Sequence, residues 1–127
     1  MVHHSRLHKV VVDVPDADHD QELSFWQSAL GQPLTRNEHL SEYHGALLQF
    51  PDLGFLVQRL EDGPARVHLD IHTDDLEAEV TRLETLGAVR VRMVSFWWVM
   101  RDPAGLPFCV IPDRRGNLNE NNAQRWD

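Results

Sequence analysis

Hydrophobic residues recur along this chain with two different periods, and the change from one period to the other happens twice. The first apolar run, Leu7–Val14, is rich in β-branched residues and predicts a strand that ends at Pro15. The next stretch predicts a helix that Asp16 or Asp18 caps and that Gly31 ends, because apolar residues recur in it at helical spacing: Leu23, Trp26 and Leu30.

The remainder of the first half predicts three short strands. Residues 32–37 are a plausible strand, and residues 38–44 are a polar connection. Two further strands, 45–50 and 55–60, flank the turn-forming sequence at 51–54. The first half is therefore predicted to be β-α-β-β-β.

The second half repeats this order more compactly. Residues Val67–Thr73 alternate between apolar and polar side chains, and successive side chains of a strand point to opposite faces. One face is therefore polar, with His68, Asp70 and His72. The other face is expected to pack on the helices, together with two residues of the last strand: Val67, Leu69, Ile71, Phe108 and Val110.

A second helix is predicted after this strand. Asp74 or Asp75 caps it, Glu77 lies three residues after Asp74 as in a capping box, and Gly87 ends it. Its apolar stripe consists of Leu76, Val80, Leu83 and Leu86. Three strands follow at 88–94, 96–101 and 107–111, with a turn at 102–105.

The two halves also share local sequence. Leu7-His8-Lys9-Val10 is matched 60 residues later by Val67-His68-Leu69-Asp70, and each helix ends in Leu-Gly. Each half closes with a Gly-x-x-x pattern, Gly54 to Gln58 and Gly105 to Cys109. Modules at about 7–61 and 67–112 are thus a duplicated unit, which predicts a pseudo-symmetric cavity lined by His8, Gln58, His68 and Cys109.

Composition limits the classes of function. The 127 residues are enough for one domain, which we place at 1–112 with a polar tail at 113–127. A net charge of −8 disfavours nucleic acid and anionic membranes as partners. The single cysteine forms no internal disulfide, no stretch reaches the roughly 20 apolar residues of a membrane span, and the first residues lack a secretory pattern, so a cytoplasmic location is expected.

The tail is too polar to bury much surface, so we expect it to be mobile. Trp126 is its exception. An indole beside the end of a chain is either exposed or docked on its own subunit or on a partner.

The order of these motifs resembles the vicinal oxygen chelate superfamily, which includes glyoxalase I, extradiol dioxygenases, methylmalonyl-CoA epimerase and the bleomycin-resistance proteins. The resemblance covers about Leu7 to Pro112. It is carried by the histidine early in each module and by the Asp102-Pro103-x-Gly105 turn. The stretch from Val67 to Val110 is particularly similar to glyoxalase-like domain proteins. The resemblance implies an α+β fold in which two βαβββ modules form a curved mixed sheet around a cleft.

In metal-using members of this superfamily, the first strand of each module provides a His, Gln or Glu ligand and the last strand provides a carboxylate. His8 and His68 match the first-strand positions. Gln58 and Cys109 stand where many of these enzymes carry glutamate. Two histidines and a thiolate could still hold Zn²⁺ with an open position, whereas an Fe²⁺ site of two histidines and one carboxylate lacks its carboxylate. We therefore favour a site without metal.

Each candidate also has a purely structural interpretation. Cys109 lies in an apolar strand, where a free cysteine is most often a small buried hydrophobe. Asp70 could orient an imidazole, although the simpler explanation is that it lies at the solvated rim of the cleft. Trp97 and Trp98 must point to opposite faces, so one of them at most lines the cavity. The other histidines lie in predicted loops or at the terminus and are assigned no chemical role: His3, His4, His19, His39 and His44.

Two functions remain open. In the binding hypothesis, a metal-free cleft holds a small aromatic or cationic molecule between Trp, Phe and Gln walls, as the bleomycin-resistance proteins do. In the enzyme hypothesis, a divalent metal on His8 and His68 polarises the substrate of a lyase, isomerase or dioxygenase. A regulatory module that senses a metabolite is a third possibility. The open edges of such a sheet predict a two-fold homodimer, formed either by side-by-side pairing of modules or by exchange of modules.

Overall fold

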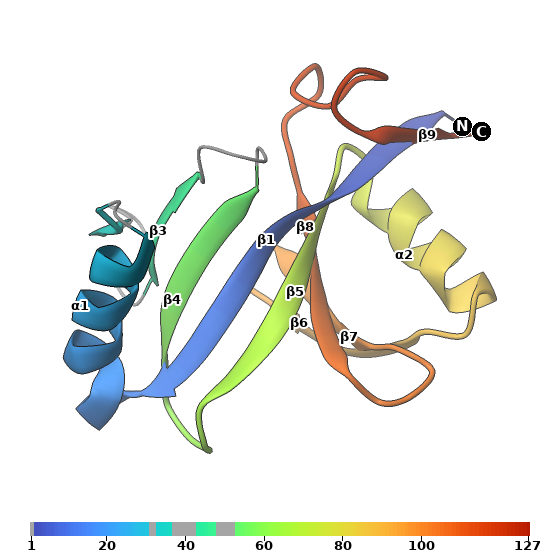
Figure 1. The fold of residues 1–127 in the computed structure, drawn as a ribbon. Helices are drawn as coiled ribbons and strands as arrows, with labels where there is room; N and C mark the ends of the chain where they lie inside the picture. The colour runs from blue at the N-terminus through green and yellow to red at the C-terminus, as the bar shows by residue number, and fades with distance from the viewer. Residues whose placement is uncertain (1, 31–32, 37–42, 48–52) are drawn as a thin grey trace. The chain divides into compact units, whose positions relative to one another are not determined.

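The structure is a computed structural model that describes residues 2–30, 33–36, 43–47 and 53–127 (Figure 1). It contains two compact units. The first-module unit is Lys9–His68, and the second-module unit is Met1–His8 with Leu69–Asp127. Strands β1 (His3–Pro15) and β5 (Arg66–Thr73) each run from one unit into the other. The first residues of the chain therefore belong to the unit that the second module builds.

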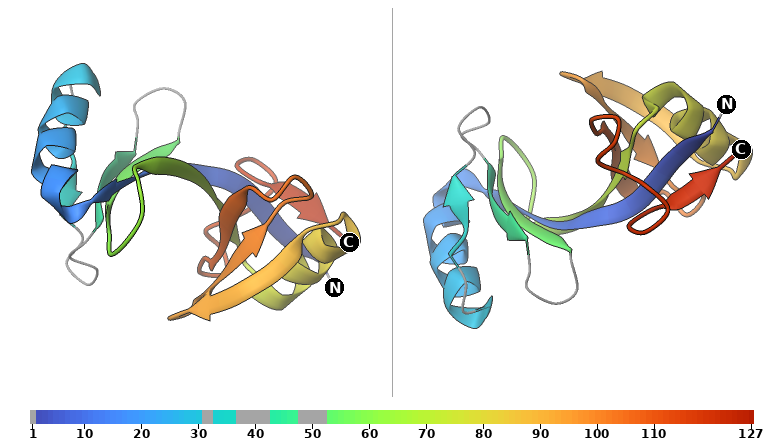
Figure 2. Two further views of the ribbon diagram at one scale, coloured as in Figure 1. Left: turned by 90° about the horizontal axis from the view of Figure 1, so that it is seen from below. Right: turned by 90° about the horizontal axis from the view of Figure 1, so that it is seen from above.

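The first-module unit is a mixed sheet with one helix. Its strand order is β2-β3-β4-β1, in which β1 is parallel to β4 (Gly54–Leu60). The other pairs are antiparallel, namely β4 with β3 (Tyr43–Leu47) and β3 with β2 (Thr35–Arg36). The turn η1 (Asp16–Asp18) leads into α1 (His19–Leu30), which lies beside β4 (Figure 2). Asp16 and Asp18 thus form a 3₁₀ turn before the helix, and the first two residues of the predicted turn at 51–54 lie outside the described residues.

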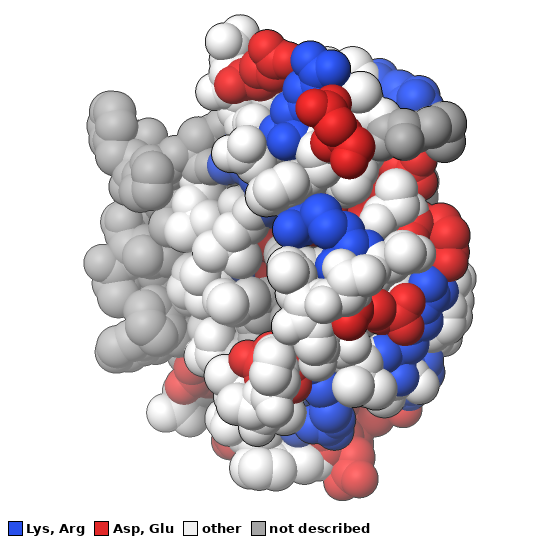
Figure 3. Space-filling view, turned by 90° about the vertical axis from the view of Figure 1, so that its right-hand side faces the viewer, with Lys and Arg blue, Asp and Glu red and all other residues white. Residues whose placement is uncertain are grey.

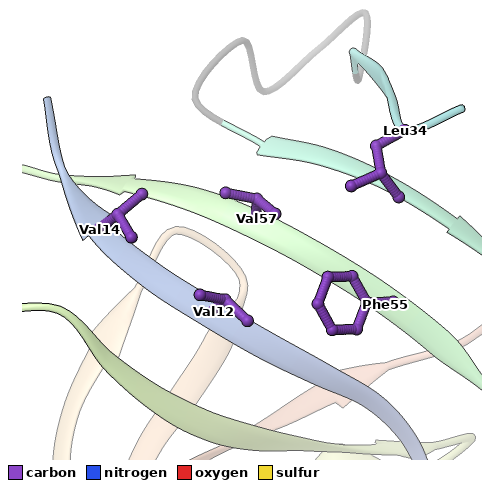
Figure 4. Packing of buried hydrophobic residues seen from close by; sticks show 5 residues of the cluster. All are labelled: Val12, Val14, Leu34, Phe55 and Val57. Atoms are coloured by element: carbon purple, nitrogen blue, oxygen red, sulfur yellow. The ribbon is translucent and has the colours of Figure 1, made fainter. Parts of the chain in front are cut away.

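Alternation along β1 and β4 builds the core of this unit. Val12, Val14 and Val57 are buried together with Leu34 and Phe55 (Figure 4). Leu23 of α1 packs against them, so this face of the strands is the helix side. Val11 and Asp13 point to the opposite face, because they alternate with Val12 and Val14. Both are nevertheless buried, with 0% and 2% of their surface exposed.

The second-module unit has the strand order β5-β8-β7-β6. Its elements are α2 (Leu76–Thr85), β6 (Val89–Val94), β7 (Trp97–Arg101), β8 (Pro107–Pro112) and β9 (Gln124–Trp126). The side chain of Asp75 accepts a hydrogen bond from the Ala78 amide at 3.1 Å, so Asp75 is the cap of α2. The capping box predicted from Asp74 and Glu77 is wrong, because Asp74 bonds to His4 instead.

The predicted core of this unit is correct in part. Val80, Met100 and Val110 are buried, and Leu76, Leu83 and Phe108 pack against them. Leu69 and Ile71 share the face of Phe108 and Val110 by strand register, as predicted. However, Val67, Leu69 and Leu86 are 56%, 43% and 65% exposed.

The C-terminal tail is part of this unit, and the expectation of a mobile tail is wrong. β9 pairs antiparallel with His3–Ser5 of β1. The Trp126 indole donates a hydrogen bond to Ser5 Oγ at 2.9 Å, and the Arg82 guanidinium lies 3.8 Å from the centre of its ring. Trp126 is therefore docked on its own chain. This strand forms because it pairs with His3–Ser5. The partner is 119 or more residues away in the sequence, so no local pattern could reveal the pairing.

A buried carboxylate joins the start of β1 to α2. Glu79 has no exposed side-chain surface and accepts two hydrogen bonds from Arg82, at 2.9 and 2.7 Å. His3 Nε2 lies 2.7 Å from the same carboxylate, although the sequence analysis placed His3 in a loop or at the terminus and gave it no role. His4, likewise on β1, contacts Asp74 through its backbone and its ring, at 2.8 and 2.9 Å.

Acidic and basic side chains alternate over the surface of the second-module unit (Figure 3). Arg90 contacts Glu77 and Glu84 of α2, at 2.8 and 3.0 Å. Neither α1 nor α2 combines the length and the apolar character that crossing a bilayer requires, and the described residues contain no other α-helix.

The Glu79 network predicts a specific dependence of stability on pH. Burial raises the pKa of Glu79, but hydrogen bonds from Arg82 and His3 outweigh it and hold this pKa below its usual value. The folded chain therefore binds fewer protons than the unfolded chain in this range, so acid favours unfolding. We expect the free energy of unfolding to fall as the pH drops below about 4.5, and Glu79→Gln to weaken this fall and to cost about 1–3 kcal/mol at pH 7. Urea unfolding between pH 7 and about pH 3 measures both effects.

Glu61→Gln makes the same chemical change at an exposed position and is the control. Equal pH dependence in wild type and Glu79→Gln would contradict the assignment.

Candidate functional site

A carboxylate–imidazole pair lies in the first-module unit, on the side of β1 and β4 opposite α1. His68 Nδ1 is 2.5 Å from Asp13 Oδ2, and Asp13 is 2% exposed. The second oxygen of this carboxylate, Oδ1, is buried without a hydrogen-bond partner. We assign the Nδ1 proton to His68, donated to Asp13, because a charged carboxylate only accepts. Chemistry at His68 then goes through Nε2.

Gln58 joins this pair on the same face of the sheet. Asp13 and Gln58 are directly paired residues of β1 and β4, and paired residues of neighbouring strands point to the same side. We call this surface the helix-free face of the first-module unit, defined by Val11, Asp13, Gln58 and His68. It combines a carboxylate, an imidazole and an amide above the buried apolar side chain of Val11.

A second carboxylate–imidazole pair lies in the second-module unit. His72 Nδ1 is 3.2 Å from Asp113 Oδ2, and the rings of His72 and His8 lie 4.1 Å apart between centres. Burial raises the pKa of Asp113, but hydrogen bonds from Asn117 and His72 reverse this and lower it. His8 is therefore a neighbour of His72. Its predicted partnership with His68 involves both units and stays a prediction.

Asp70 and Cys109 are directly opposite each other on β5 and β8 of the second-module unit. They are 3% and 9% exposed, and a carboxylate oxygen of Asp70 lies within 4.8 Å of the Cys109 sulfur. The interpretation of Asp70 as a solvated rim residue is thus wrong, because its side chain is buried. Burial of Cys109 agrees with its structural interpretation as a small buried residue.

Trp97 and Trp98 point to opposite faces, as predicted. Trp98 packs against the Val80, Met100 and Val110 cluster on the α2 side. Trp97 alternates with it and therefore shares the side of Val99 and Cys109, which are paired between β7 and β8. The Trp97 side chain is 9% exposed and meets Phe96 edge to face at 5.0 Å.

The donor atoms on β5 and β8 suit a divalent metal. His68 and Asp70 project from the same face of β5, two residues apart, and Asp70 faces Cys109. Nitrogen, oxygen and sulfur donors are the ligands that Zn²⁺ accepts. Asp13 on Nδ1 of His68 is the outer carboxylate that ligating histidines commonly have. Asp70 is thus a carboxylate next to Cys109, although the last-strand positions themselves carry none.

Three of these residues were missed in the sequence. Asp13 is the only acid within the valine-rich run 10–14, and a carboxylate among β-branched residues is a signal that a buried partner exists. His72 was placed on the correct face without a role. Asp113 was assigned to the tail, because its pairing with His72 spans 41 positions of the sequence.

Comparisons with known proteins agree with this architecture. A family model described as a glyoxalase-like domain matches residues 9–111. None of the curated proteins matches the chain. A hypothetical protein from Bacillus halodurans has a similar structure, with 12% identity, coverage of 91% of this chain and 99% of that chain, and a TM-score of 0.63.

Two similar structures are enzymes. One is a mutant of 4-hydroxymandelate synthase from Streptomyces coelicolor, with 15% identity, coverage of 91% of this chain and 50% of that chain, and a TM-score of 0.63. The other is methylmalonyl-CoA epimerase from Mycobacterium tuberculosis, with 19% identity, coverage of 84% and 86%, and a TM-score of 0.53. At these identities the likeness shows the fold, and it confirms the predicted mixed sheet.

The Asp13–His68 pair predicts a tautomer that can be measured. In wild type, neutral His68 should carry its proton on Nδ1, because the buried carboxylate accepts it. Asp13→Ala removes the acceptor, so the Nε2–H tautomer should dominate, with a loss of about 1–3 kcal/mol in the free energy of unfolding. Imidazole ¹⁵N chemical shifts identify the tautomer. Asp18→Ala, at an exposed position, is the control. An Nε2–H tautomer in wild type would refute the assigned pair.

Proposed function

Because the chain belongs to the glyoxalase-like domain family of the vicinal oxygen chelate superfamily, we propose that it binds a small organic molecule at the helix-free face of its first-module unit. The observation that supports this proposal is the Asp13–His68 pair, a buried carboxylate that fixes the orientation of an imidazole. Gln58 adds an amide that both donates and accepts hydrogen bonds. The bound molecule therefore carries polar groups opposite these side chains and an apolar part.

His68 is the group that would act on this molecule. With Nδ1 bonded to Asp13, Nε2 can accept a hydrogen bond or a proton from a bound molecule, and the Asp13 carboxylate stabilises the imidazolium that results. Asp13 is thus a positioning residue. The same arrangement serves a binding protein, in which Nε2 accepts a hydrogen bond, and an enzyme, in which it accepts a proton.

The proposal places the protein in the cytoplasm, because a reducing compartment suits the free thiol of Cys109.

A metal-dependent lyase, isomerase or dioxygenase is the second candidate. It is favoured by the approach of the Asp70 carboxylate to Cys109 within 4.8 Å, beside His68 on the same strand. When bound by these residues, Zn²⁺ or Fe²⁺ would act as a Lewis acid on oxygen atoms of a substrate. His68 and Asp70 would provide the ligands, Cys109 would provide a thiolate, and Asp13 would hold His68 in the ligating tautomer.

The two candidates differ in their dependence on metal. We expect protein purified without metal, in the presence of a chelator, to bind members of a library of small polar and aromatic compounds, including catechol. Binding should shift the imidazole signals of His68 in NMR spectra. The substitution His68→Gln should lower the affinity for these compounds at least about tenfold. Asp70→Asn should leave this binding within about twofold of wild type.

If compounds shift these signals only after Zn²⁺ is added, and Asp70→Asn or Cys109→Ala removes the effect, the metal-dependent function replaces the proposal. If no compound shifts His68 under either condition, both are wrong.

We also propose that the chain forms a homodimer through β6. This strand ends the strand order of the second-module unit, so one edge of its backbone pairs with no other strand of the described residues (Figure 2). Val89, Val91 and Met93 of β6 are 60%, 45% and 48% exposed, which is much apolar surface for one edge strand. A second copy would cover this edge.

Light scattering at micromolar concentration tests the dimer. Wild type should have twice the mass of one chain, and Val91→Lys should have the mass of one, because a lysine ammonium resists burial in an apolar interface. Leu106→Lys places the same charge in an exposed turn, where Leu106 is 65% exposed, and should remain dimeric. A monomeric wild type would contradict the proposal.

A further inference from the structure

A group of imidazole and guanidinium side chains lies on the α1 side of the first-module unit, away from the helix-free face. His44 pairs with Val57 and with Arg36 in the strand register, and Arg59 pairs with Val14. Val14 and Val57 belong to the core under α1, so His44, Arg36 and Arg59 project to that side. His19, the first residue of α1, completes the group, with its ring centre 5.0 Å from that of His44.

Two ring nitrogens in this group are buried without hydrogen-bond partners. They are Nε2 of His19 and Nδ1 of His44, and His19 as a whole is only 1% exposed. Arg59 Nη2 lies 3.4 Å from Nδ1 of His19. A guanidinium only donates hydrogen bonds, so Nδ1 of His19 is an acceptor and its proton is on Nε2. The chain thus buries an N–H donor and offers it no acceptor among the described residues.

Both cationic and acidic groups lie around these nitrogens. Burial lowers the pKa of His44, and the nearby His19, Arg36 and Arg59 lower it further, so these groups share one electrostatic environment. Arg59 is bound to Asp16 at 2.7 Å, and Asp20 is 3.6 Å from Nδ1 of His19 with its carboxylate 98% exposed. Arg36 is exposed and has no ion pair with any residue of the described ranges. Arg36 is directly paired with His44, so its guanidinium, which has no ion pair within the described ranges, lies next to one of the two unsatisfied rings.

The geometry points to an oxyanion-binding site formed by His19, Arg36, His44 and Arg59, which accepts the phosphate or carboxylate group of a small molecule. A phosphate or carboxylate oxygen accepts the proton of His19 Nε2 and takes a charge-assisted hydrogen bond from Arg36. His44 donates once it is protonated, and an anion beside it favours the protonated form. This site does not depend on the function proposed above, since the two use opposite faces of the same strands.

Phosphate and acetate are the probes. Each is titrated at constant ionic strength with chloride as the balancing anion, and the imidazole signals of His19 and His44 are followed by NMR. We expect saturable shifts at both histidines and a higher pKa of His44 in the bound state. Tighter binding of phosphate identifies a phosphate-bearing ligand, and tighter binding of acetate identifies a carboxylate.

Arg36→Gln should weaken binding at least about tenfold, because it removes one charge-assisted contact. His44→Gln, at a half-buried position, should also weaken it. Arg92→Gln makes the same charge change on β6 and should bind as wild type does. Shifts that do not saturate, shifts that chloride alone reproduces, or equal affinity in Arg36→Gln would overturn the site and would indicate that water satisfies the buried nitrogens.

Discussion

A carboxylate that leaves water must find a partner of matching charge or hydrogen bonding, and histidines meet this requirement throughout the structure. Asp13 pairs with His68, Glu79 with His3, Asp74 with His4, and Asp113 with His72. These four pairs join residues 41 to 76 positions apart in the sequence. Strand pairing and helix docking in each unit therefore have to satisfy them together.

The role of each carboxylate–histidine pair depends on its position in the fold. Glu79 and His3 lie where β1, β9 and α2 meet, and Trp126 and Arg82 close the group, so these side chains hold the chain ends in place. Asp13 and His68 lie on the side of β1 and β4 opposite α1, outside the buried cluster that packs against the helix. A buried pair there gains little for the core. It does give an imidazole a fixed orientation, which is what binding and proton transfer require.

The two candidate functions use the same histidine in different ways. In the proposed binding function, Nε2 of His68 faces an organic molecule directly. In the metal-dependent function, the same atom would be a ligand beside Asp70 and Cys109. Both depend on Asp13, because a carboxylate on Nδ1 makes the opposite nitrogen more basic whichever partner it meets. The family and the fold are common to both functions, so they are distinguished by what binds Nε2 of His68, an organic molecule or a metal ion.

Periodicity in the sequence predicted both helices, most of the strands and the side to which their side chains point, because these follow from local backbone geometry. Phe108, Val110, Trp97 and Trp98 are placed as predicted for this reason. The tertiary structure decided what covers each face. Leu69 stays exposed although it shares the face of Phe108, and part of the polar tail is a strand because His3–Ser5 lies beside it. It also decided the partner of His68: the sequence offered Asp70, its neighbour on the strand, whereas the fold brings in Asp13 from 55 residues away, since pairing between distant strands leaves no local signal.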